Sequence, residues 1–248
     1  MKQDPRKDSA GVPWQGRQFQ ENPWAGDDGQ TPEEIALALS ANPFDKIQFL
    51  NSLRNQRLLI PLLAELGEGE IGPHGQLVDK SADLAIVAVA TPDGKTAIPA
   101  FTSVEAMSKW NSESRPVPVS VEKLCLAAAS EGHERVVINP VTDSKVIRRT
   151  QIAALAQGLD LIDVVFDVRV AEIVSAAALT SEQILEVRLQ DGDPEATLRS
   201  QELLIELKIK TGLSQEQLAE VLEVFVQALT NAKFDQLADS FGIKVLAS

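Results

Sequence analysis

The sequence predicts an α+β protein, with a mixed or antiparallel sheet and helices in an N-terminal domain and a smaller ββαβ domain after it. Three observations predict this class. Apolar residues make up 44% of the 248 residues, which is enough for a substantial core. Thr91-Pro92-Asp93-Gly94-Lys95 separates two apolar runs, as in a β-hairpin. The last third of the chain contains two alternating runs, an amphipathic helix and a closing apolar run.

The chain divides into three expected parts. Residues 1–30 are polar, carry no hydrophobic period and predict an extended or disordered leader. Residues 31–158 predict the larger α+β domain, and residues 159–248 predict the smaller one. The leader nevertheless carries Trp14 and Trp24, which either fold back onto the domain or anchor in the pocket of a partner. We favour the fold-back interpretation.

The first elements of the larger domain carry clear start and stop signals. Thr31-Pro32-Glu33-Glu34 predicts a helix that begins with a capping box, and Asn42-Pro43-Phe44-Asp45 predicts a second helix that ends near Asn55. Residues 57–63 predict a strand in which Pro61 marks an edge or a bulge. Residues 65–80, rich in glycine and acidic residues, predict a loop.

The remaining elements of this domain follow the same two patterns. Residues 84–90 and 96–101 predict the strands of the hairpin, and residues 135–139 and 144–148 predict a second pair. The predicted helices run from a cap at Ser103 to Trp110, from a cap at Ser120 to Gly132, and from the last strand to Gly158.

The smaller domain begins with a predicted helix over residues 167–178. Its expected apolar set is Val168, Ala171, Ile173 and Val174. Residues 184–189 and 203–210 predict half-buried strands. Ser214-Gln215-Glu216-Gln217 is a capping box that starts an amphipathic helix, and residues 241–246 predict the closing strand.

Charge argues against two classes of partner. The formal net charge is −13, and residues 160–248 alone hold seven basic and sixteen acidic residues. A protein that binds nucleic acid by neutralising phosphates needs a basic face, so we expect neither nucleic acid nor an anionic membrane as partner. The acidic third serves solubility or forms a docking face for a basic partner. No transmembrane segment or secretory signal is evident, so we expect a cytoplasmic protein.

No motif predicts catalysis, a metal site or a cofactor. Cys125 is the only cysteine, so no intramolecular disulfide is possible, and its apolar neighbours predict a buried residue. Gly94-Lys95-Thr96 lacks the earlier glycine of a phosphate-binding loop and opens a strand. His74 and His133 are far apart in sequence, and Asp27-Asp28-Gly29 lacks the ligand spacing of a calcium loop. We therefore expect a protein that is not an enzyme.

Several segments together resemble the SseB-like family, known mainly by its N-terminal domain. The segments that carry the resemblance are Arg57-Leu58-Leu59-Ile60-Pro61, Asp79-Lys80-Ser81-Ala82-Asp83-Leu84-Ala85, Asp93-Gly94, Ala97-Ile98-Pro99-Ala100-Phe101-Thr102-Ser103, Arg115-Pro116-Val117-Pro118-Val119 and Ala154-Leu155-Ala156-Gln157-Gly158. The leader segments Ala10-Gly11-Val12-Pro13-Trp14-Gln15-Gly16-Arg17 and Asn22-Pro23-Trp24-Ala25-Gly26-Asp27-Asp28-Gly29 resemble the actinobacterial branch. The resemblance implies an α+β cytoplasmic domain and supplies no catalytic residues.

The expected function is a non-catalytic protein-interaction module with a protein partner. Its candidate binding residues in the leader are Trp14, Arg17, Trp24, Asp27 and Asp28. Pro61 and Pro99 mark either blunted sheet edges or edges at which a peptide docks.

The alternative is a domain that senses a small, amino-acid-like molecule. Its candidate residues are Phe101, Thr102 and Ser103, where N–H groups at the start of the following helix could hold a carboxylate. A simpler interpretation makes Ser103 an N-cap and Phe101 a core residue.

Overall fold

The computed structural model describes residues 24–62, 70–71, 77–78 and 87–247 of the chain. In chain order the elements are α1 (Glu33–Ser40), α2 (Lys46–Ser52), β1 (Arg57–Leu62), β2 (Glu70–Ile71), β3 (Leu77–Val78), β4 (Val89–Ala90), β5 (Thr96–Ala100), α3 (Val104–Trp110), β6 (Arg115–Ser120), α4 (Val121–Ser130), β7 (Arg135–Ile138), β8 (Lys145–Arg148), α5 (Arg149–Gln157), α6 (Val168–Ala178), β9 (Ile184–Asp191), β10 (Leu203–Ile209), α7 (Gln215–Asn231), the short 3₁₀ helix η1 (Phe234–Gln236) and β11 (Phe241–Ala247). Parallel and antiparallel pairs occur together, which confirms the α+β class. Among the described residues, no helix is both long and apolar enough to cross a membrane.

The N-terminal half is built on the sheet β4-β5-β7-β8. Strands β5 and β7 are parallel, whereas β7 and β8 form the predicted antiparallel hairpin. The predicted turn before β5 is closed by a hydrogen bond from the Thr91 N–H to the Lys95 carbonyl at 2.9 Å. A bridge between Leu59 and Phe101 links this sheet to the antiparallel pair β1-β6.

Each face of this sheet is covered by a different part of the chain. One face packs with α1, α2, α4 and α5 around a core that includes Ile98, Val136 and Ile147. The other face carries Ala97, Val137 and Val146, which pack against Leu198 from the C-terminal half. The loop before β10 therefore closes the second face of the N-terminal sheet.

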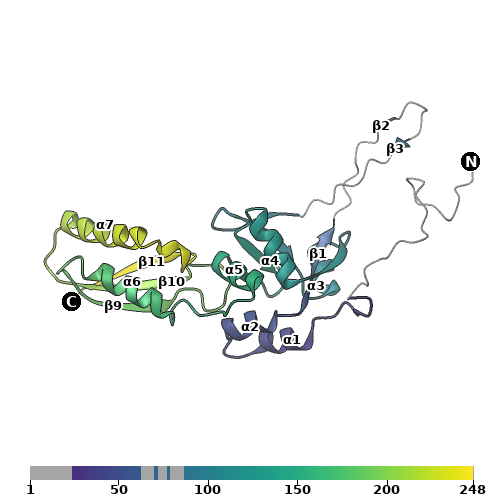
Figure 1. The fold of residues 1–248 in the computed structure, drawn as a ribbon, viewed down its shortest axis with the longest axis horizontal. Helices are drawn as coiled ribbons and strands as arrows, with labels where there is room; N and C mark the ends of the chain where they lie inside the picture. The colour runs from purple at the N-terminus through teal and green to yellow at the C-terminus, as the bar shows by residue number, and fades with distance from the viewer. Residues whose placement is uncertain (1–23, 63–69, 72–76, 79–86, 248) are drawn as a thin grey trace, which may run out of the picture.

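The C-terminal half is a three-stranded sheet in the order β11-β10-β9, with α6 and α7 packed on one face. Figure 1 shows these elements at one end of the molecule, α1 to α4 at the other end, and α5 between them. The expected ββαβ order is present, and α6 adds a second helix to the covered face. The main core of this half is separate from that of the N-terminal half.

Buried ion pairs join the two halves. Asp239, whose side chain is 0% exposed, accepts hydrogen bonds from Arg135 on β7 at 2.7 Å and from Arg148 on β8 at 3.3 Å. Arg148 also donates to Asp193 at 2.6 Å, and Arg135 donates to Asp93 of the hairpin turn at 2.9 Å. Burial alone would raise the pKa of the Asp193 carboxyl, but hydrogen bonds from Arg148 and from backbone N–H groups leave it lowered. The boundary near residue 158 stays a prediction.

Two predicted helix starts are wrong in detail. The α1 helix has Pro32 at its N-cap without a side-chain hydrogen bond, because the Thr31 hydroxyl instead lies 2.9 Å from the Thr102 hydroxyl. The second helix begins at Lys46, where Asp45 caps it by accepting from the Gln48 N–H at 2.8 Å. In both places the residue at the N-cap differs from the one that the sequence pattern indicated.

Three other predictions need correction. The loop expected over residues 65–80 contains the short antiparallel pair β2-β3. Strand β6 was not expected, and its prolines pair opposite β1. On α6 the buried residues are Val170, Val174 and Ala177, so the helix is rotated and Val168 is 66% exposed.

Candidate functional site

The segment that follows Trp24 is held against the N-terminal half by a buried arginine. Arg57 on β1 donates to both carboxylate oxygens of Asp27, with an Nη2–Oδ1 distance of 2.8 Å. The same guanidinium donates to the backbone carbonyls of Gln30 and Thr102. The Arg57 side chain is buried, and its hydrogen bonds hold the pKa of the Asp27 carboxyl below its usual value. The Arg57 guanidinium thus donates to four oxygen atoms, two carboxylate oxygens and two backbone carbonyl oxygens.

The turn between Trp24 and Gln30 explains the Asp-Asp-Gly sequence. The Asp27 N–H donates to the Trp24 carbonyl at 3.1 Å, and the carboxylates of Asp27 and Asp28 accept from the N–H groups of Gly29 and Gln30. Gly29 has a φ of +75°, and a Cβ there would lie 2.8 Å from a Val104 methyl group. Only glycine fits this close approach without a shift of the neighbour.

A polar cluster lies next to this segment, after the parallel strands β5 and β7. The Asn139 side chain accepts from the Thr102 N–H and donates to the Thr102 hydroxyl, both at 3.1 Å. Phe101 is buried, and Ser103 caps α3 by accepting from the Ala106 N–H at 3.1 Å. Thr102, Ser103 and Asn139 line an open hollow of about 370 Å³.

The start of α3 has fewer free donors than the carboxylate hypothesis requires. The Val104 N–H donates to the Gly29 carbonyl at 2.8 Å, and the Ala106 N–H donates to the Ser103 side chain. These two donors are therefore used within the chain. A carboxylate in the hollow would therefore gain no hydrogen bond from these two N–H groups.

Five of the eight predicted binding residues lie together in this region: Asp27, Asp28, Phe101, Thr102 and Ser103. They contact each other and neighbouring segments of the chain, which gives them a structural role, and their role in binding stays a prediction. Trp24 is half-buried at the start of the described segment, and Trp14 and Arg17 lie outside the described residues. Arg57, which connects these residues, had no local signal as a site residue.

A second feature, an apolar groove, was not predicted. It lies between the loop that leads into α2 and residues 161–166, and it encloses about 740 Å³. Phe44 and Ile162 line it, and Phe166 beside them is 82% exposed. An aromatic side chain exposed to this degree beside a groove is a common feature of docking surfaces.

Local hydrogen bonds hold Phe166 in this position. The Phe166 N–H donates to the Asp163 carbonyl at 2.9 Å, and the Val165 N–H donates to the Asp163 carboxylate at 3.1 Å. The next residue, Asp167, caps α6 by accepting from the Arg169 N–H at 2.9 Å. The exposed ring is thus attached to a turn and a helix start.

The groove is acidic at its rim. The buried ammonium of Lys46 lies 2.8 Å from Asp191 and 3.5 Å from Asp163. Asp45 lines the same groove, so the lining contains three carboxylates and one lysine. One face of the Phe44 ring is already covered by Lys145, whose Nζ lies 4.0 Å from the ring centroid. The free negative charge favours a basic ligand.

The cysteine and the described histidine lie outside both of these sites and contact neighbouring groups of the chain. Burial raises the pKa of the Cys125 thiol to about 12, which keeps the thiol protonated. His133 lies 3.0 Å from the Thr96 hydroxyl and 3.5 Å from Glu131, while His74 lies outside the described residues. In the part of the chain that the structure describes, no three His, Cys, Asp or Glu side chains are grouped so as to hold a metal ion.

Comparison with known protein families identifies part of the chain. Residues 33–154 match the SseB protein N-terminal domain. The matched range runs from the first residue of α1 into α5, so it contains Arg57, Thr102 and Ser103 but ends before Phe166. Among the curated proteins, none matches the chain.

Proposed function

We propose that the chain is a non-catalytic protein-interaction module of the SseB-like family, whose N-terminal domain its residues 33–154 match, and that it binds peptide segments in the groove lined by Phe166. The observation that carries the proposal is the exposed Phe166 ring, which extends from a hydrogen-bonded turn beside an apolar groove with an acidic rim. Burying a phenylalanine side chain yields about 1.5–3 kcal/mol, so a partner that covers it gains affinity at once.

The groove defines the chemistry of the ligand. Phe44, Ile162 and Phe166 suit an apolar side chain of the partner, and Asp45 and Asp163 suit a lysine or arginine beside it. The acidic C-terminal third supports the same preference, because a basic segment is attracted to it over a longer range. The partner is thus a peptide with an apolar anchor and basic flanks.

Selection from a random peptide library on the immobilised full chain tests this function. We expect enriched peptides to carry an apolar residue flanked by Lys or Arg, and their affinity to fall as ionic strength rises. Phe166→Asp should weaken binding at least about tenfold. Leu126→Asp is the matched control, because Leu126 is an exposed apolar residue of α4 that does not line the groove. Acidic peptides, or equal losses in both variants, would contradict the proposal.

The hollow beside Thr102 and Ser103 supports a second candidate function, the sensing of a small, amino-acid-like molecule. Its lining includes Lys109 and Asp143, which could contact a carboxylate and an ammonium group. Thermal unfolding in the presence of each amino acid tests it. A ligand should raise the unfolding temperature of the wild type and leave that of Thr102→Val unaffected, whereas a flat profile for every amino acid would count against sensing.

The remaining expectations belong to the same proposal. We propose a cytoplasmic protein of the actinobacterial branch, on the strength of its leader segments, and one whose partner is a protein rather than nucleic acid. The separation of the chain into a leader, a domain ending at residue 158 and a smaller domain is also part of it.

A further inference from the structure

In the N-terminal half, the outer edges of β6 and β8 are closed to a further strand. The Leu59 N–H and carbonyl both bond to Phe101, so the backbone of Leu59 points away from its β6 partner Pro118. By the same alternation, the nitrogens of Pro116 and Pro118 face the outer edge, where a proline has no N–H to donate. On the far side, the Val146 N–H of β8 donates to Ala196 at 2.7 Å. Neither edge is free to add a strand.

The edge of β9 is different. Its only strand partner among the described residues is β10, and it contains no proline. The Gly192 N–H donates to the Glu202 carbonyl, so the ladder bonds to β10 fall on Gln190, Arg188 and Glu186. The backbone groups of Val187 and Leu189 therefore point outward, and no described backbone group bonds to them. This edge can accept a strand.

We propose that the β9 edge is the interface between two copies of this chain, paired antiparallel with Val187 on the two-fold axis. The two three-stranded sheets would then form one continuous sheet. This surface is distinct from the groove beside Phe166, and the inference does not depend on the function proposed for that groove.

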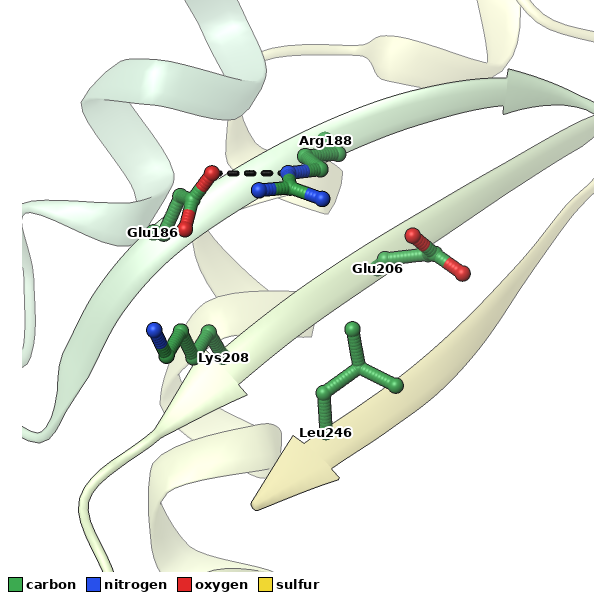
Figure 2. A pocket seen from close by; sticks show the side chains of 5 residues that line it. All are labelled: Glu186, Arg188, Glu206, Lys208 and Leu246. Atoms are coloured by element: carbon green, nitrogen blue, oxygen red, sulfur yellow. Dashed lines mark hydrogen bonds and ion pairs between the residues drawn. The ribbon is translucent and has the colours of Figure 1, made fainter. Parts of the chain in front are cut away.

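Charge selects this register among those that the outward backbone groups allow. With Val187 on the axis, Glu186 of each copy lies opposite Arg188 of the other. A shift that puts Arg188 or Glu186 on the axis places like charges opposite each other. Figure 2 shows Glu186 and Arg188 on the same face of β9, where they form an ion pair at 2.7 Å within one chain.

The surroundings of the edge fit a second copy. The exposed surface of α6 carries the short side chains of Ala171, Ser175 and Ala176, which let a second helix approach. Leu179 and Leu185 lie on either side of the turn between α6 and β9, and both are exposed in the single chain. The backbone edge of β9 supplies polar groups for a second copy, and the exposed surface of α6 with Leu179 and Leu185 supplies apolar ones. Stable interfaces combine both kinds of surface.

The net charge of −13 opposes association over long distances, but salt screens it beyond about 8 Å at physiological ionic strength. The charges of Glu186 and Arg188 compensate each other near the two-fold axis, so the interface itself carries little net charge. A short-range attraction can therefore act while the long-range repulsion is screened. We accordingly expect dimerisation to be weaker at low salt than at physiological salt.

Sedimentation velocity of the full chain over a range of concentrations tests the proposal through charge exchange. We expect the wild type to dimerise, and Arg188→Glu alone or Glu186→Arg alone to weaken the dimer at least about tenfold, because each places like charges opposite each other twice. The double variant Glu186→Arg/Arg188→Glu should recover the wild-type dimer constant within about threefold. Glu105→Arg, on the exposed surface of α3, is the control and should leave the dimer unchanged.

A second variant tests the backbone. Val187→Pro removes an outward N–H without removing a bond to β10, so the folded chain should remain monomeric, with an unchanged circular dichroism spectrum. A wild type that stays monomeric at every concentration would overturn the proposal. So would a dimer that survives Val187→Pro, or a double variant that does not recover.

Discussion

Replacing Asp239 with asparagine tests how strongly the stability of the interface between the two halves depends on buried charge. The Asp239 side chain is fully buried and lies between the guanidinium groups of Arg135 and Arg148. Asparagine keeps the shape of the side chain but removes the anion, so two buried cations lose a shared counter-charge. Removing one partner of a buried ion pair costs about 3–5 kcal/mol.

We expect the lower end of this range, about 3 kcal/mol, because each arginine retains another carboxylate: Asp93 for Arg135 and Asp193 for Arg148. For a chain of this size, 1 kcal/mol corresponds to about 2–4 °C, so the unfolding temperature should fall by about 6–12 °C. Calorimetry measures that temperature, and urea unfolding measures the free energy.

The exposed pair Lys109–Glu105 is the matched control. Its Nζ–Oε1 distance is 2.7 Å, equal to that between Arg135 and Asp239, but both of its side chains are more than half exposed. Glu105→Gln should therefore leave the free energy of unfolding essentially unchanged. If Asp239→Asn is as mild as this control, burial does not set the strength of these pairs and the reasoning is refuted.

Two further predictions concern single groups. Because burial raises the pKa of Cys125 to about 12, the thiol of the folded chain should resist alkylation at mildly alkaline pH and react at the ordinary rate once urea unfolds the chain; rapid labelling of folded protein would contradict its burial. Because Arg57 lowers the pKa of Asp27, the stability that this pair contributes is present above the ordinary aspartate value of 3.8 and is lost as pH falls through the folded value. The fluorescence of nearby Trp24 should accordingly stay constant from neutral pH to about pH 4 and change only below it, whereas Arg57→Met should change it at neutral pH.

The elements that were predicted correctly carry their signals locally. Ser103, Ser120 and Ser214 each cap the helix that follows, since an N-cap needs only a side chain and an N–H three residues later. The hairpin turn around Asp93 and the stop at Gly158, with its φ of +67°, are equally local. Such features depend on a few consecutive residues.

The features that were missed depend on distant partners. Strand β6 contains two prolines and is a strand because β1, more than fifty residues earlier, pairs with it. The Thr31 hydroxyl bonds to Thr102 across 71 residues rather than to its own helix. The pairing of Asp27 with Arg57 is of the same kind, because its partner lies 30 residues away on β1, and the role of Asp27 in partner binding stays a prediction.

The groove beside Phe166 corresponds to a sequence pattern that is less specific than a helix cap or a turn. The run from Leu159 to Phe166 is rich in apolar residues but has neither a helical nor a strand period. Such a run belongs to a core or to a surface that something else covers, and only the exposure of Phe166 decides between these two. An aperiodic apolar segment between two predicted domains is thus a useful indication of a docking surface.

The position of the interface between the two halves has a practical consequence for anyone who isolates the part of the chain that matches the SseB domain. A fragment cut at residue 158 contains the whole match to the SseB domain, yet it lacks Asp193 and Asp239. Arg135 and Arg148 would then meet water on a face that also loses the cover of Leu198. The sequence limits of the family and the limits of a soluble, well-behaved fragment are therefore different in this molecule, and expression trials should extend past η1 to include Ser240.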